Sequence, residues 1–172
     1  MPRKQSAGLL MYREGAGGLE VLLVHPGGPF WVGKEEGAWS IPKGEFGDGE
    51  APLQAAKREF EEETGVAPPG GALLPLAPVR QRSGKIIHAW ALRGDFAVAA
   101  LRSNVFSLEW PPHSGRREEF PEVDRAAWFS VGNARRKITK GQLPLLDELE
   151  RHLAEAATGA AHCGAPTGWR KR

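Results

Sequence analysis

One segment, Gly44–Val66, constrains the fold of this chain more than any other. It opens with three glycines in seven residues, and good helix formers then fill residues 51–64, with Pro52 in the first turn and Gly65 at the end. Proline is tolerated where a helix begins, and glycine commonly follows where it ends. The apolar positions of this stretch recur on one helical face: Leu53, Ala56 and Phe60. The segment therefore predicts a glycine-rich turn followed by an amphipathic helix.

The same helix crowds acidic side chains onto one face. Glu59, Glu62 and Glu63 stand at positions i, i+3 and i+4, so their carboxylates are neighbours. Like charges at this spacing repel, and bound divalent cations would relieve the repulsion. Oxygen ligands favour Mg²⁺, Mn²⁺ or Ca²⁺ over soft metals. The alternative interpretation of the acidic face alone is an ordinary solvated surface.

Composition limits the other function classes. The 172 residues suit one domain, and the net charge of +2 is too small for a general DNA-coating or membrane-coating surface. Between residues 45 and 63, however, seven acids face two bases, so the rest of the chain is basic. The single Cys163 cannot form an internal disulfide, and no apolar run is long enough to span a membrane. We expect a cytoplasmic protein.

The remaining apolar patterns predict an α/β domain over residues 1–157 and a flexible basic tail over 158–172. Two strand pairs are expected to form hairpins, and two further strands and a second helix follow: 7–12 with 19–25, 73–82 with 85–93, then 106–110, 126–129 and the helix 141–157.

The acidic segment also has the fixed spacings of one family, carried by Gly44, Glu50, Arg58, Glu59, Glu62, Glu63 and Gly65. In this order, residues 44–66 resemble a complete Nudix box. The resemblance implies the Nudix fold, an α/β/α sandwich around a mixed β-sheet. It also implies hydrolysis of a nucleoside diphosphate linked to another group, with Mg²⁺ as the cofactor and Mn²⁺ as a substitute.

The resemblance assigns roles to individual side chains. Glu62 and Glu63 would be the principal metal ligands, and Glu59 would be a ligand or the base. Glu50 would join a second metal, and Arg58 would orient Glu59 through a charge-assisted hydrogen bond. Lys43, directly before the box, would offer its backbone carbonyl to metal and would also lie at the substrate.

A later segment offers further candidates. Glu122 or Glu119 is expected to supply an additional ligand or base, because many Nudix enzymes place another carboxylate after the box. Arg116 and Arg117 would contact substrate phosphates, and Trp110 would stack on a base. The alternatives are ordinary surface arginines and a core tryptophan. Three segments, 39–43, 106–110 and 119–129, resemble a bacterial Nudix branch described as predicted nucleoside triphosphate pyrophosphohydrolases.

These observations predict a metal-dependent hydrolase that cleaves a pyrophosphate bond in a nucleoside di-, tri- or polyphosphate by attack of water at phosphorus. The expected partner is a small nucleotide-like molecule, and we expect neither a membrane nor a nucleic acid. One alternative is removal of pyrophosphate from RNA 5′ ends, which needs a longer basic track than the sequence displays. Another is a nucleotide-binding module without turnover, although such modules usually lose glutamates of the box.

Overall fold

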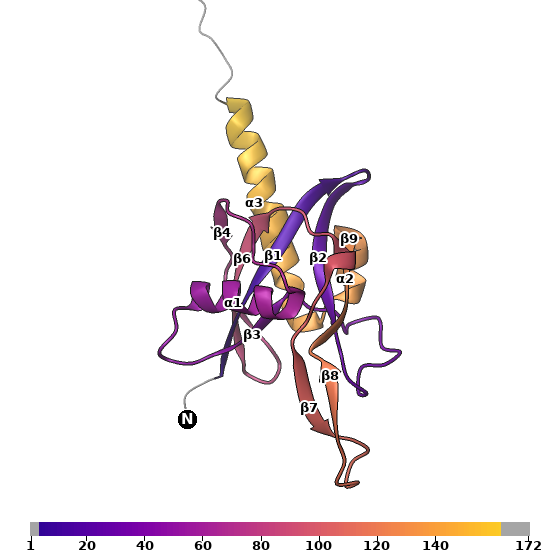
Figure 1. The fold of residues 1–172 in the computed structure, drawn as a ribbon. Coiled ribbons are helices and arrows are strands. Elements are labelled where there is room, and N and C mark those ends of the chain that lie inside the picture. The colour runs from indigo at the N-terminus through magenta and orange to yellow at the C-terminus, as the bar shows by residue number, and fades with distance from the viewer. Residues whose placement is uncertain (1–3, 163–172) are drawn as a thin grey trace, which may run out of the picture.

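A mixed β-sheet forms the centre of the computed structural model, which describes residues 4–162 (Figure 1). The strand order is β4-β6-β1-β2-β9, with β3 pairing β1 and β5 pairing β6. β6 runs parallel to β1, and the other pairs are antiparallel. The bounds are β1 Gln5–Gly15, β2 Gly18–Pro26, β3 Lys43–Phe46, β4 Leu73–Pro75, β5 Val79–Arg80, β6 Ile86–Arg93 and β9 Val123–Ser130.

Both predicted hairpins form, but the second is interrupted. β1 and β2 close tightly, with Gly15 opposite Gly18. The strand predicted over 73–82 is divided into β4 and β5, each of which pairs with β6. Pro75 and Pro78 lie at the break, and proline has no N–H to donate to a strand ladder.

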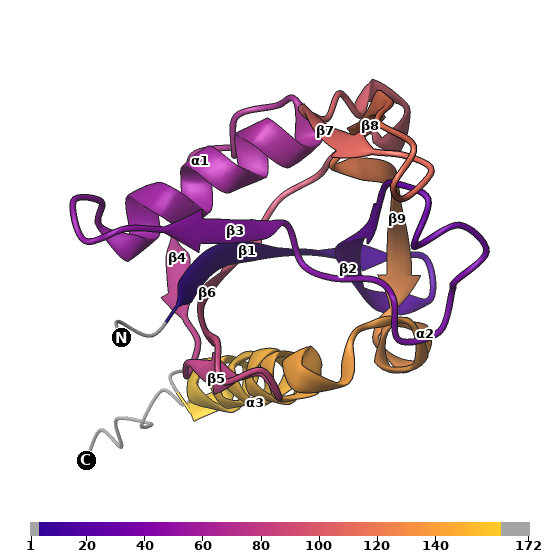
Figure 2. The same ribbon diagram turned by 90° about the horizontal axis from the view of Figure 1, so that it is seen from below.

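Helices cover both faces of the sheet, as Figure 2 shows. α1 (Pro52–Thr64) packs on one face, where Phe60 is fully buried. α3 (Leu143–His162) packs on the other face through Leu145, Leu146 and Leu149. α1 ends at Gly65, which has φ 81° and donates its N–H to the Glu61 carbonyl at 2.7 Å. The expected α/β/α sandwich is therefore confirmed.

The C-terminal region departs from the sequence prediction. A short helix that was not predicted, α2 (Val131–Lys137), follows β9 and is capped by Ser130, whose Oγ accepts the Asn133 N–H at 3.4 Å. α3 runs five residues beyond the predicted end at Ala157, so the first five residues of the predicted flexible tail are helical. The rest of the predicted tail, 163–172 with Cys163, lies outside the described residues. No helix of the described region is long and apolar enough to cross a membrane.

A second, separate sheet contains the strand predicted over 106–110, which forms as β7 (Val105–Glu109), and a strand that was not predicted, β8 (Arg117–Pro121), which replaces part of the loop expected before 126–129. The two strands pair antiparallel and project from the body of the molecule (Figure 1). Phe106 faces Phe120 across the pair, with ring centroids 6.0 Å apart. Cross-strand aromatic contact of this kind stabilises the pairing of β8 with β7, although the charged sequence of β8 does not itself predict a strand.

Candidate active site

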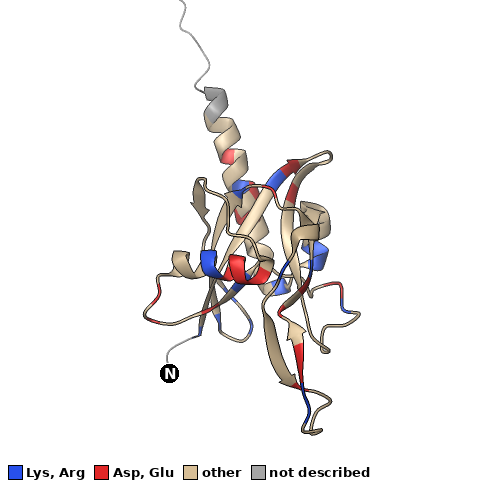
Figure 3. Cartoon of the chain, in the orientation of Figure 1, with Lys and Arg blue, Asp and Glu red and all other residues tan. Residues whose placement is uncertain are grey.

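The acidic face of α1 lies against β3 and the turn that precedes the helix. Glu59, Glu62 and Glu63 belong to the last two turns of α1, and Figure 3 shows this part of the helix in red beside a basic turn. Glu50 comes from the preceding turn, where its N–H donates to the Gly47 carbonyl at 3.2 Å. Turn and helix together therefore place four carboxylates of the box in one region.

Arg58 is the cation at the centre of this group. Its Nε donates to Glu50 Oε2 at 2.8 Å, and its Nη1 donates to Glu59 Oε1 at 2.8 Å and to Glu62 Oε2 at 3.0 Å. These bonds raise the pKa of Arg58 and lower that of Glu50. One guanidinium thus holds three carboxylates, and the contact with Glu59 is the one that the sequence prediction requires.

Glu63 is held from the side of β3. The Lys43 N–H donates to Glu63 Oε2 at 3.1 Å, so Lys43 contacts the site through its amide, while the role expected of its carbonyl toward a metal stays a prediction. Burial raises the pKa of Glu63 to about 8, against the opposing charge of Lys43. Burial also lowers the pKa of the Lys43 ammonium. At Gly44, any side chain would overlap the Glu59 carboxylate, which explains glycine at the first position of the box.

Glu122 joins the group from a distant part of the chain. It lies between β8 and β9, and its N–H donates to the Asn104 carbonyl at 2.8 Å, while the Asn104 N–H donates to the Glu62 carbonyl at 2.9 Å. Burial, and next the charge of Glu62, raises the pKa of Glu122. A small cavity of about 100 Å³ is lined by Lys43, Glu63 and Glu122. We call Glu50, Glu59, Glu62, Glu63 and Glu122 the carboxylate cluster.

The other residues predicted after the box lie along the projecting hairpin. The guanidinium of Arg117 bonds to Ser107 on β7, with Nε donating to Oγ at 3.0 Å. Strand geometry puts Arg117 about 13 Å from Pro121 at the base of the hairpin. Trp110 contacts Phe30 edge-on, with ring centroids 5.5 Å apart. Arg116 is exposed near the tip, and Glu119 is exposed on β8. The structure therefore brings Glu122, but not these four residues, to the cluster.

The donor set fits a hard divalent cation. As the side chains stand, no group of three or more Asp, Glu, His or Cys residues within 4–162 is arranged to hold a metal ion, because Arg58 lies among three of the carboxylates. All of the cluster's donors are nevertheless oxygens, which Mg²⁺ prefers. The cavity beside Glu63 and Glu122 exceeds the volume of a water molecule. A cation held also by Glu59 or Glu62 would require Arg58 to release part of its present contacts with them.

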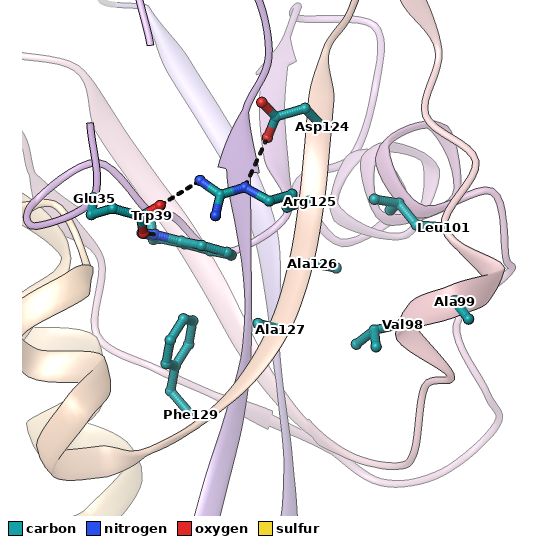
Figure 4. A pocket seen from close by; sticks show the side chains of 10 residues that line it. All are labelled: Glu35, Trp39, Val98, Ala99, Leu101, Asp124, Arg125, Ala126, Ala127 and Phe129. Carbon is teal, nitrogen blue, oxygen red and sulfur yellow. Dashed lines mark hydrogen bonds and ion pairs between the residues drawn. The ribbon is translucent and has the colours of Figure 1, made fainter. Parts of the chain in front are cut away.

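A larger pocket that sequence reasoning missed opens beside β9 (Figure 4). It measures about 650 Å³, with Trp39 and Phe129 on one side, and Val98 and Leu101 on the other. Arg125 lies at the rim, where its guanidinium is 5.1 Å from the Trp39 ring. The consecutive small residues at 126–127, directly before two bulky aromatic residues, are the only sequence signal of this space. The pocket reaches Asp124, two residues beyond Glu122.

Comparison with known proteins agrees with this geometry. The NUDIX domain family model matches residues 2–149. The NUDIX domain of Shewanella oneidensis NrtR, solved with ADP ribose, is 18% identical with a TM-score of 0.62, over 89% of this chain and 90% of that chain. A Caenorhabditis elegans Ap4A hydrolase is 24% identical with a TM-score of 0.60, over 87% of this chain and 98% of that chain. A Listeria innocua MutT/Nudix protein is 18% identical with a TM-score of 0.61, over 92% and 98%.

One curated relative is more similar in sequence but much longer. An octanoyltransferase from Myxococcus xanthus is 32% identical over 102 residues, which are 59% of this chain and 25% of that protein. The matched region thus spans a quarter of that relative. The domain match over residues 2–149 includes the box, the sheet and the carboxylate cluster. The chain belongs to the Nudix hydrolase family.

Proposed function

We propose that this protein is a metal-dependent hydrolase that cleaves a pyrophosphate bond in a nucleotide-type substrate. One observation carries the proposal: three separate segments, the turn before α1, α1 itself and the β8–β9 junction, converge in one carboxylate cluster. Glu59, Glu62 and Glu63 would hold Mg²⁺, with Glu50 and Glu122 completing the set. Arg58 offsets the charge of three of these carboxylates, but five carboxylates gathered around one arginine still favour binding of a divalent cation.

The protein groups around the cluster have complementary roles in this chemistry. A bound divalent cation would neutralise phosphate oxygens and lower the pKa of a water molecule. Arg58 fixes the orientation of Glu59 through the 2.8 Å hydrogen bond. Burial raises the pKa values of Glu59 and Glu122, which brings each closer to that of an effective base at neutral pH. The leaving group is a phosphate, so no covalent nucleophile is needed.

The pocket beside β9 supports a nucleotide as the substrate. Its volume of about 650 Å³ lies within the range of small-molecule sites, and it combines one aromatic wall and one aliphatic wall with polar groups at the rim. The unpaired side of β9, the last strand of the sheet, adds backbone donors and acceptors that can read the edge of a ring. We propose that the pocket takes the base while the phosphates reach the cluster.

Two adjacent alanines test the role of the pocket. Ala99 lines the pocket, whereas the neighbouring Ala100 does not, and both are exposed on the same short helical turn, η1 (Val98–Ala100). We expect Ala99→Trp to raise KM for the best nucleotide about tenfold, as expected when binding contacts are lost. Ala100→Trp is the matched control and should leave KM unchanged. Equal effects of the two substitutions would exclude the pocket as the base site.

A substrate screen tests the proposed reaction itself. The protein would be incubated with Mg²⁺ and nucleoside triphosphates, nucleotide sugars, dinucleoside polyphosphates or 5′-triphosphorylated RNA, and the release of phosphate and pyrophosphate would be measured. We expect hydrolysis of at least one small nucleotide, abolished by a chelator and restored by Mg²⁺ or Mn²⁺. Turnover of RNA alone would favour the RNA 5′-end alternative. Nucleotide binding without turnover of any substrate would indicate a binding module.

A further inference from the structure

A glutamine in the C-terminal part of the fold is buried beside a segment that reaches the proposed site. Gln142 ends the short helical turn η2 (Lys140–Gln142) before α3 and is completely buried. Its Oε1 accepts the Ile41 N–H at 3.0 Å, and its Nε2 donates to Ser40 Oγ at 2.9 Å. Burying an amide is costly unless its polar atoms are paired, and here both ends of the amide bond to adjacent residues of one distant segment. We call residues 40–43 the wall segment.

The wall segment borders the small cavity at the carboxylate cluster. Ser40 and Lys43, its two ends, line this cavity of about 100 Å³ together with Glu63 and Glu122. The Lys43 N–H also donates to Glu63 Oε2 at 3.1 Å, so one end of the segment is bonded directly to the cluster. The two hydrogen bonds of Gln142 therefore hold a segment that in turn holds Glu63.

Backbone hydrogen bonds support the wall segment on either side of the position that Gln142 binds. Ser40 exchanges two of them with Val24 on β2, at 2.8 and 3.0 Å, and the Pro42 carbonyl accepts another from β1 at 3.1 Å. Between these residues, the buried Ile41 N–H is bound by the Gln142 side chain. Removing the amide of Gln142 would leave that N–H unpaired but would leave the backbone bonds on both sides in place. The expected result is a local displacement of the segment.

We propose that Gln142 is a positioning residue for the reaction: its side-chain amide holds the wall segment against the carboxylate cluster and so keeps Glu63 in place. The inference rests on the proposed function and adds to it a residue outside the Nudix box. Gln142 is not one of the described residues that line the cavity, so it acts through Ser40 and Ile41. Displacing a reacting group by about 1 Å can lower a rate about a hundredfold. A shift of the wall segment should therefore lower kcat more than it raises KM.

Solvent exchange of the Lys43 amide proton tests the positioning without any need for turnover. Gln142→Met keeps the length of the side chain and removes both amide hydrogen bonds. We expect the Lys43 amide, followed by NMR in the folded, metal-free protein, to exchange about tenfold faster in this variant, because its bond to Glu63 opens more often. Leu149→Val removes a methylene from the core cluster that also contains Ile41, and this matched control should change the rate less than about twofold. Equal exchange rates in Gln142→Met and the wild type would overturn the proposal.

Steady-state kinetics then separate positioning from a merely structural role. Gln142→Met should lower kcat about tenfold with KM within twofold of the wild type, whereas Leu149→Val should change neither. A raised KM with unchanged kcat, or equal losses of kcat in both variants, would contradict the proposal. Absence of turnover on every substrate, with faster Lys43 exchange still seen in Gln142→Met, would overturn the proposed function and leave the coupling of Gln142 to the cluster.

A conservative variant provides a rescue. In Gln142→Glu, the protonated acid can accept the Ile41 N–H and donate to Ser40 Oγ, whereas the ionised acid can only accept. The kcat of this variant, divided by that of the wild type at the same pH, should therefore be near one at acid pH and fall about tenfold as the pH rises. A ratio that does not change with pH would show that the bond to Ser40 has no part in the positioning and would overturn this assignment.

Discussion

The carboxylate cluster and the β7–β8 hairpin both have arginine and glutamate within a few residues of each other in the sequence, yet these charged side chains interact differently in the two regions. In the cluster, Glu59 is only 7% exposed and is held by Arg58 through a 2.8 Å bond. On the hairpin, Glu118 and Glu119 are exposed, and Arg117 bonds to a serine. The difference shows that composition alone does not define a site, because charges interact strongly only where water is displaced.

The supports of the two regions also differ. The cluster stands mainly on a helix whose backbone bonds are internal and whose Phe60 is packed in the core. The hairpin is a two-stranded sheet, which is marginal by itself and depends on contacts at its base. There the Glu122 N–H donates to the Asn104 carbonyl, and Gly27 lies so close to Pro121 that no side chain would fit. Side chains are therefore expected to be held more precisely at the base of the hairpin than toward its tip.

The largest effect should come from a single charge in the cluster. Glu63→Gln keeps the side-chain size but removes a negative charge from the proposed ligand set, and we expect turnover to fall by roughly a thousandfold with the fold unchanged. Glu61→Gln, on the exposed side of the same helix, is the matched control and should retain activity. Near-normal Mg²⁺-dependent turnover by Glu63→Gln would remove the basis of the proposed function.

A smaller effect should distinguish the base of the hairpin from its strand. Glu122→Gln should lower kcat about ten- to a hundredfold, because Glu122 shares the cluster's electrostatic field. Glu119→Gln, three residues earlier on exposed β8, should leave kcat unchanged. Steady-state kinetics on the best substrate would check both variants. The reverse ranking would assign the additional ligand or base to Glu119 instead.

The pH dependence of the free energy of unfolding should also report on the burial of a carboxylate in the cluster. In the metal-free protein, the raised pKa of Glu63, about 8 against 4.5, means that the folded state retains a proton which the unfolded chain releases. The stability due to Glu63 is thus present below about pH 4.5 and is lost as the pH rises through about 8. Thermal unfolding in a chelator should show this decline, and Glu63→Gln should flatten it. A Glu63→Gln profile that parallels the wild type would contradict the assignment.

The smallest effect should come from the hairpin tip. If Arg116 and Arg117 contact substrate phosphates, replacing both with alanine should raise KM about twofold without changing kcat, and more for longer phosphate chains. Arg102→Ala, at another exposed arginine, would serve as the control. An unchanged KM on the best substrate would show that the hairpin tip is only structural, and would leave substrate recognition to the β9 pocket.

Local patterns were sufficient for much of the fold. The bounds of α1 followed from Pro52 and Gly65, and the first hairpin followed from the glycines between its strands, because caps and turns are decided by neighbouring residues. β8 was missed because its sequence, Arg117–Pro121, is charged and becomes a strand only through its pairing with β7. Pairing energies depend on the partner strand, which local periodicity cannot reveal.

For the site, the sequence by itself predicted the chemistry: the helical repeat locks the glutamates of α1 onto one face, and their number and spacing favour binding of a cation. Only the tertiary structure decided between Glu122 and Glu119 as the neighbour of that face, and only it brought Trp39, Val98 and Phe129 together around the β9 pocket. The physical reason is the separation along the chain over which each interaction acts. A helix fixes positions three and four residues apart through its own hydrogen bonds, whereas contacts between distant segments depend on how the whole sheet closes around its core.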